Sequence, residues 1–235
     1  MIWQTLPSSF YDEEVLTVMA KNAVTRTPGE VNAVNGVLKL PLNEAFEKEL
    51  AGRMATNDIP LIIALIDVDR FLTVNETFGY DIGDRVLIET GRFLSEKAPE
   101  GADTYRISGD EFGILFHNGM EKEDVFLLME DIRRSFDVKL PDGTGCSISI
   151  GIAAAFEDAN RVPELVRKAE SAIFRVKTNG RNRVALAREE KMIPKTSHFT
   201  ADQLQALTKL SKREGVGEAI LLREALDMLL KKYDF

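Results

Sequence analysis

Acidic side chains occur at two separated places in the sequence where they could bind a metal ion. Asp67 and Asp69 end a strongly apolar run, and a buried strand of that kind holds a terminal carboxylate rigidly. Asp110 and Glu111 follow Gly109, which permits a turn with positive φ and lets a phosphate approach the backbone. Oxygen ligands suit hard divalent cations. Each pair alone is more typical of a solvated acid at a strand end or of an ordinary turn.

Basic side chains occur at a third place. Lys177 and Arg181 flank Asn179 and Gly180, which are typical of a helix C-terminus. The helix dipole favours cations there, and the same cations could also reach a triphosphate. Carboxylates for metal ions together with cations for phosphates are the groups that nucleotidyl transfer needs.

The periodicity of apolar residues predicts the elements that position these side chains. Two short apolar runs on either side of residues 108–111 have the spacing of a β-hairpin. The pattern as a whole predicts an α+β domain, with a mostly antiparallel sheet and helices packed on its faces. Strands are expected over residues 60–68, 104–107, 112–116, 147–150 and 183–187, the fourth of them half-buried, and helices over 12–22, 42–54, 86–94, 125–132 and 165–176.

The composition, with 44% hydrophobic and 29% charged residues, is that of a soluble globular protein. A net charge of -8 argues against a surface built throughout to coat nucleic acid. With Cys146 as its only cysteine, the chain can form neither an intrachain disulfide nor a cysteine-rich metal site. The sequence has no apolar run long enough to span a bilayer and no secretory signal at its start, so we expect a cytoplasmic protein without a membrane partner.

Four ordered motifs between about residues 35 and 186 resemble the GGDEF-domain diguanylate cyclases. They are LIDVDRFLTVNETFGYDIGDRVL, RISGDEF, SISIGIA and FRVKTNGRNRV. The resemblance implies a palm-like fold related to adenylyl cyclases, with one GTP held by each domain. Two domains of a homodimer would face each other and condense two GTP into cyclic di-GMP and two pyrophosphate.

The resemblance also implies a role for each matching residue. Asp67, the carbonyl of Val68, Asp110 and Glu111 would hold Mg²⁺, with Mn²⁺ as an alternative. Asp110 would also deprotonate the attacking 3′-hydroxyl, so that Asp110 and Glu111 are the expected catalytic residues. The expected substrate-binding residues are Ser108 and Gly109 under the phosphates, Lys177 and Arg181 on the triphosphate, and Asn75 and Asp84 on the guanine base.

Some positions depart from the pattern of this family. Ser108 stands where the signature has its first glycine, and the arginines expected near Leu40 and Pro41 are missing. Pro99 and Ala102 stand where the charged residues of a product-binding inhibitory motif are expected. We therefore expect weak inhibition by the product.

Residues 192–235 have a different character, with a net charge of +1. A strand over 196–199 is expected before a capping box at Thr200 and Gln203 and two amphipathic helices. The arrangement resembles ribbon-helix-helix domains, in which two chains pair their strands. A module of this size needs a partner to cover its apolar face, so we expect a dimerisation module. The resemblance also implies that Thr196 and His198 face DNA, and whether this module binds DNA is left open.

The expected organisation is an N-terminal segment of helix and loop over 1–34, a GGDEF domain over 35–189 and the module over 192–235. The alternative to a diguanylate cyclase is a catalytically weak or inactive GGDEF domain that senses GTP or cyclic di-GMP and controls a DNA-binding regulator. An inactive domain is expected to lose an acidic ligand. Asp67, Asp110 and Glu111 are all present, which favours the enzyme.

Overall fold

The structure, a computed structural model, describes residues 34–56, 60–188, 195–214 and 217–232. The chain forms two compact units that divide after Lys39, and residues 34–38 of the first unit are helical. The helix expected over 12–22 lies outside the described residues. Within the described ranges, no helix has both the length and the apolar character needed to cross a membrane.

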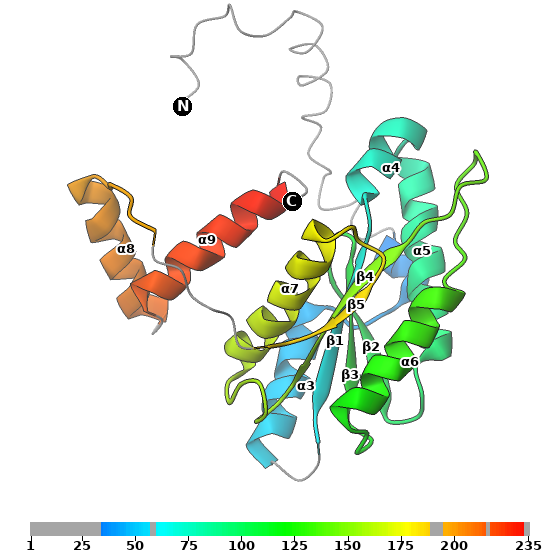
Figure 1. Cartoon of the computed structure of the whole chain (residues 1–235), viewed down its shortest axis with the longest axis horizontal. Coiled ribbons are helices and arrows are strands. Elements are labelled where there is room, and N and C mark those ends of the chain that lie inside the picture. Colours follow the sequence, from blue (N-terminus) through cyan, green and yellow to red (C-terminus); the bar gives the residue numbers. More distant parts are fainter. Residues whose placement is uncertain (1–33, 57–59, 189–194, 215–216, 233–235) are drawn as a thin grey trace, which may run out of the picture. The chain divides into compact units, whose positions relative to one another are not determined.

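A five-stranded sheet in the order β2-β3-β1-β4-β5 forms the centre of the second unit (Figure 1). All neighbouring strands are antiparallel except β4 and β5, which are parallel. The mostly antiparallel sheet is therefore confirmed. The strands are β1 (Ile62–Val68), β2 (Ala102–Ser108), β3 (Glu111–Phe116), β4 (Ile148–Ala154) and β5 (Val184–Leu186).

The pairing register brings the acidic motifs together at one end of the strands. Asp67, near the end of β1, lies opposite Glu111 on β3 and opposite Ser149 on β4. The backbone N–H of Val68 also donates to the carbonyl of Asp110 at 3.3 Å. The predicted hairpin is confirmed, and its turn lies beside the end of the central strand.

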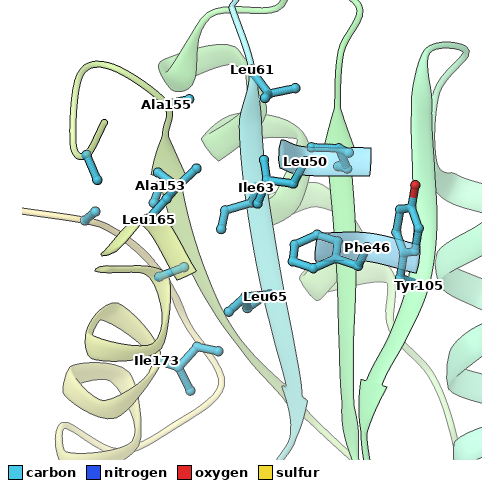
Figure 2. Packing of buried hydrophobic residues seen from close by; sticks show 14 residues of the cluster. Phe46, Leu50, Leu61, Ile63, Leu65, Tyr105, Ala153, Ala155, Leu165 and Ile173 are labelled. Carbon is cyan, nitrogen blue, oxygen red and sulfur yellow. The ribbon is translucent and has the colours of Figure 1, made fainter. Parts of the chain in front are cut away.

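Helices cover both faces of the sheet. Figure 2 shows the core on the face covered by α3 and α7, where Phe46 and Leu50 pack against Ile63, Leu65 and Tyr105. The helices α5 and α6 pack on the sheet from the other side (Figure 1). The helices around the sheet are α3 (Asn43–Thr56), α4 (Phe71–Phe78), α5 (Tyr80–Lys97), α6 (Lys122–Ser135) and α7 (Val162–Thr178).

Close packing between α7 and β4 fixes the height of α7 above the sheet. A Cβ at Gly151 would lie 2.1 Å from the carbonyl oxygen of Ala169, so any larger residue would push α7 away from β4. The strand itself is buried along its whole length, whereas we expected a half-buried strand from the alternation of serine and isoleucine. Ser149 can be fully buried in this strand because its hydroxyl forms a hydrogen bond with Asp69.

The C-terminal segment contains α8 (Ala201–Glu214) and α9 (Glu218–Lys232). The capping box is confirmed. The backbone N–H of Thr200 donates to the Gln203 side chain at 3.0 Å, and that of Gln203 donates to Thr200 Oγ1 at 3.3 Å. The strand expected over 196–199 is absent from the described chain, where residues 195–200 form neither helix nor strand. A strand needs a hydrogen-bonded neighbour, and the resemblance assigns that neighbour to a second chain.

Candidate active site

The turn between β2 and β3 presents Asp110 and Glu111 half-buried and Ser108 and Gly109 exposed. Ser108 Oγ donates to a carboxylate oxygen of Glu111 at 2.5 Å. Gly109 does not adopt a positive φ, so the turn does not need glycine for the reason that the sequence suggested. A Cβ at Gly109 would meet nothing within 4 Å among the described residues, so the backbone at this position is open to an approaching phosphate.

Arg106 supports the turn from the protein interior. Its guanidinium Nη2 donates to the carbonyl of Gly109 at 3.0 Å, and the residue is only 3% exposed. The pairing of β2 with β3 shifts register between Arg106 and Ser108. Sequence reasoning missed Arg106, although a charged residue in an otherwise apolar strand is a signal that could have found it.

Asp67 forms an ion pair with Lys177, which comes from the last turn of α7. Lys177 Nζ lies 2.8 Å from Asp67 Oδ2, and both side chains are largely buried. Burial raises the pKa of Asp67 to about 7, and the negative charge of Asp110 adds to this rise, whereas Lys177 opposes it. The charge of Glu111 also raises this pKa, so the structure brings four of the predicted site residues into one electrostatic cluster.

The other carboxylate oxygen of Asp67 is suited to bind a metal cation. Asp67 Oδ1 is buried and has no hydrogen-bond partner among the described residues. A hard divalent cation binds carboxylate and carbonyl oxygens of this kind. No three His, Cys, Asp or Glu side chains in the described ranges already form a metal-binding group. Asp110 and Glu111 act electrostatically on Asp67, so they are the nearby carboxylates that would join it in holding such a cation.

Asp69, the second acid of the predicted pair, has different surroundings. Ser149 Oγ donates to its Oδ1 at 2.6 Å, and Ser147 Oγ and the backbone N–H of Asn182 donate to its Oδ2 at 2.6 and 3.0 Å. Both oxygens are therefore engaged by the protein. The side chain ties β1 to β4 and to the loop that follows α7.

That loop carries Arg181, the second expected phosphate ligand. Arg181 lies four residues after Lys177, and its backbone N–H donates to the carbonyl of Val176 at 2.9 Å. This bond keeps Arg181 beside the last turn of α7, where the ion pair with Asp67 lies. As predicted from the sequence, Lys177 and Arg181 both lie at the C-terminal end of a helix.

The two residues expected to read guanine lie on neighbouring helices. Asn75 is on α4 and Asp84 is on α5. The helices meet at Gly83, where a Cβ would lie 1.9 Å from Asn75 Oδ1. The contact places the side chain of Asn75 against the turn of α5 that contains Asp84. A short distance along the chain separates α4 from β1, so both residues belong to the same end of the sheet as Asp67.

Thr196 and His198, the residues expected to face DNA, are both exposed. On α8 and α9, large apolar side chains are also exposed. They are Leu204, Leu222, Leu226, Met228 and Leu229.

The fold and the acidic turn are those of a GGDEF domain, and comparisons with known proteins agree. Residues 39–183 match the family "Diguanylate cyclase, GGDEF domain", so the chain belongs to the GGDEF-domain family. Residues 192–234 match the ribbon-helix-helix domain. Both resemblances found in the sequence are confirmed.

Two relatives are named diguanylate cyclases. Diguanylate cyclase A of Treponema denticola is 32% identical over 132 residues, which are 54% of this chain and 35% of the relative. DosC of Escherichia coli strain K12 is 31% identical over 145 residues, which are 60% of this chain and 31% of the relative. The chain therefore spans about a third of the length of these relatives.

A solved GGDEF domain has a similar fold. The GGDEF domain of YfiN, also called TpbB, from Pseudomonas aeruginosa superposes with a TM-score of 0.61 at 28% identity. The match covers 65% of this chain and 99% of that domain. The remaining third of this chain therefore lies outside the shared fold.

Proposed function

We propose that this protein is a diguanylate cyclase that condenses two GTP molecules into cyclic di-GMP with the help of Mg²⁺ or Mn²⁺. The observation that carries the proposal is the contact between Asp67 and Lys177, at 2.8 Å, beside Asp110 and Glu111. The contact puts the ammonium group of Lys177, on α7, beside the carboxylates of β1 and the hairpin. Lys177 lies 110 positions along the chain from Asp67. Nucleotidyl transfer needs this combination of groups.

The proposed roles follow from the positions of the side chains. Asp67, the Val68 carbonyl, Asp110 and Glu111 are the proposed metal ligands, and a divalent cation bound there would neutralise charge on the α-phosphate and the leaving pyrophosphate. Asp110, half-buried in the turn, is the proposed base for the 3′-hydroxyl. Lys177 and Arg181 are proposed to hold the triphosphate, for which Lys177 exchanges its contact with Asp67 for one with phosphate oxygens.

Guanine selection is proposed for Asn75 and Asp84. A carboxylate such as that of Asp84 can accept hydrogen bonds from both the ring N–H and the exocyclic amine of guanine, and adenine offers no such pair of donors. The close approach of Asn75 to Gly83 puts the Asn75 side chain beside the turn of α5 that carries Asp84, which supports a shared role of the two residues.

The assembly is proposed to be a homodimer, because each domain binds one GTP and two must meet. The exposed leucines of α8 and α9 support a module that is covered by a second copy of the chain. Family membership of this segment also supports DNA binding by the dimer. Its net charge of +1 provides little attraction to phosphates, so dimerisation is the role that we place first.

Asp110→Ala tests the proposed reaction. Incubation of the wild-type protein with GTP and Mg²⁺ should yield cyclic di-GMP, measured by chromatography. Asp110→Ala should lower the rate at least a hundredfold because it removes both a base and a metal ligand, with an unchanged melting temperature because the residue lies in a turn. A wild-type protein that binds GTP but forms no product would support the sensor function instead.

A further inference from the structure

Asp69, two residues from the proposed metal ligand Asp67, accepts hydrogen bonds at both carboxylate oxygens. It is 6% exposed, and three protein donors approach its two oxygens at 2.6 to 3.0 Å. Ser149 links the set further, because its hydroxyl also accepts from the backbone N–H of Asn182 at 3.2 Å. The carboxylate therefore holds the backbone of Asn182 both directly and through Ser149.

The segment that Asp69 holds has an unfavourable backbone conformation. Gly180, Arg181 and Asn182 follow one another with φ values of 102, 60 and 49°. For residues other than glycine a positive φ is unfavourable, and it persists only where surrounding contacts enforce it. Two such residues in succession need an anchor, and Arg181 is one of them.

A second contact comes from α6. Arg133 Nη1 donates to Asn182 Oδ1 at 2.8 Å, so the side chain and the backbone of Asn182 are bound from two different elements. Since Asn182 follows Arg181 directly, these contacts set the direction in which the chain presents Arg181. Neither contact involves an atom that we assign to substrate or metal.

We propose that Asp69 is a positioning residue that holds the loop after α7 so that Arg181 is aimed at the triphosphate, and that it is not a metal ligand. This inference rests on the proposed function of Arg181 as a phosphate ligand. Its support is the geometry of Asp69: protein donors occupy three of the roughly four lone-pair sites of its carboxylate, whereas Oδ1 of Asp67 accepts from no described donor. Holding the guanidinium of Arg181 in place before the ligand arrives lowers the entropic cost of binding the phosphate.

Asp69→Asn tests the inference in the full-length protein. The amide presents an NH₂ donor where the carboxylate had an accepting oxygen, so at least one of the three hydrogen bonds must be lost or reversed. The ligand is 3′-deoxy-GTP, which lacks the attacking hydroxyl and therefore remains intact, and its affinity is measured by calorimetry with Mg²⁺. We expect Asp69→Asn to weaken binding about tenfold, with an unchanged Mg²⁺ concentration for half-maximal binding.

A double-mutant cycle with Arg181→Ala identifies the route of the effect. If Asp69 acts through Arg181, the double variant binds 3′-deoxy-GTP as weakly as Arg181→Ala alone. Multiplicative losses in the double variant, or an altered Mg²⁺ dependence of Asp69→Asn, would overturn the inference. Wild-type binding of 3′-deoxy-GTP without synthesis of cyclic di-GMP from GTP would instead overturn the proposed function and leave the inference standing.

Two serine variants keep the inference testable if Asp69→Asn folds poorly. Ser147→Ala removes a donor to Asp69 that makes no recorded contact with Asn182, and we expect binding within twofold of wild type. Ser149→Ala removes the indirect link from Asp69 to Asn182 and leaves the direct bond, and we expect binding that is two- to fivefold weaker. Equal affinities for the two variants would contradict the proposed role.

Discussion

The contact between Gly83 and Asn75 makes the proposed guanine site sensitive to a single methyl group. In Gly83→Ala, the new Cβ would lie 1.9 Å from Asn75 Oδ1, so the Asn75 side chain must move. Because α5 itself can accommodate alanine, we expect a folded protein whose KM for GTP rises about tenfold or more. Steady-state kinetics with GTP measures the change.

Gly52→Ala is the matched control, because Gly52 also lies in a helix and its Cβ would meet nothing within 4 Å. This substitution should leave KM unchanged and raise the stability by up to about 1 kcal/mol, since alanine favours the helix. An equal KM for Gly83→Ala and wild type would show that Asn75 does not contribute to substrate binding.

Asp67 and Asp69 show what could be predicted at the scale of residues. The sequence predicted that both acids end a buried strand, and this is where the structure places them. Their different environments depend on Lys177 in one case and on Ser147 and Asn182 in the other. These partners lie roughly 80 to 110 positions away in the chain, and local spacing contains no information about such contacts. The roles of the site residues in metal and substrate binding stay predictions.

At the scale of elements, Glu130 on α6 holds the edge strand β5 and the loop before it. Its carboxylate accepts from the backbone N–H of Val184 at 3.2 Å and from Arg133 at 2.8 Å. The hydrogen bond from Arg133 lowers the pKa of Glu130, against the opposing effect of burial, and the bond from Val184 lowers it further. Arg133 in turn contacts Asn182, so Glu130 supports the loop that carries Arg181.

Glu130→Gln should therefore reduce stability in a pH-dependent way. A carboxylate whose pKa is lower in the folded state stabilises the fold above its unfolded pKa, near 4.5, and this contribution is lost as the pH falls through the folded value. At pH 7 we expect a loss of about 1 to 2 kcal/mol in the free energy of unfolding. The difference from wild type should shrink as the pH decreases toward 3, measured by urea denaturation.

Asp131→Asn is a control on the same helix, since Asp131 is exposed. Its effect should stay within about 0.5 kcal/mol at every pH. A loss for Glu130→Gln that is independent of pH would mean that packing, rather than the charge of Glu130, holds β5.

The sequence predicted most of the elements because their apolar periodicity is regular. It missed α4 (Phe71–Phe78), whose eight residues are too few for a clear helical period. It predicted a strand over 196–199, but the structure of the single chain shows none there, because a strand also needs a hydrogen-bonded neighbour. Close packing at Gly151 was also not predictable, because it depends on how near α7 lies to β4.

At the scale of the whole molecule, the C-terminal module should determine how concentrated the catalytic domains are around each other. Two domains joined through a stable dimer have an effective concentration of roughly millimolar for a short linker. A protein ending at Lys191 should be monomeric at low micromolar concentration and lose specific activity steeply on dilution. Light scattering and a dilution series of initial rates measure both properties.

Leu226→Glu in the full-length chain is the companion variant, since it places a charge on an exposed apolar position of α9 without shortening the protein. It should reproduce the concentration dependence of the truncated protein. A truncated protein that remains equally dimeric and equally active on dilution would assign assembly to the catalytic domain, and DNA binding would become the better explanation of the module.

The single cysteine has a practical consequence for measuring this assembly. Cys146 is the only thiol in the chain and is only partly exposed. Burial raises the pKa of this thiol, the charge of Glu89 adds to the rise, and Arg85 opposes it, so little reactive thiolate exists at neutral pH. A second cysteine introduced on an exposed surface would react with a maleimide spin label much faster than Cys146. Distances between labels on two copies could then be measured by pulsed electron resonance without removing the natural residue.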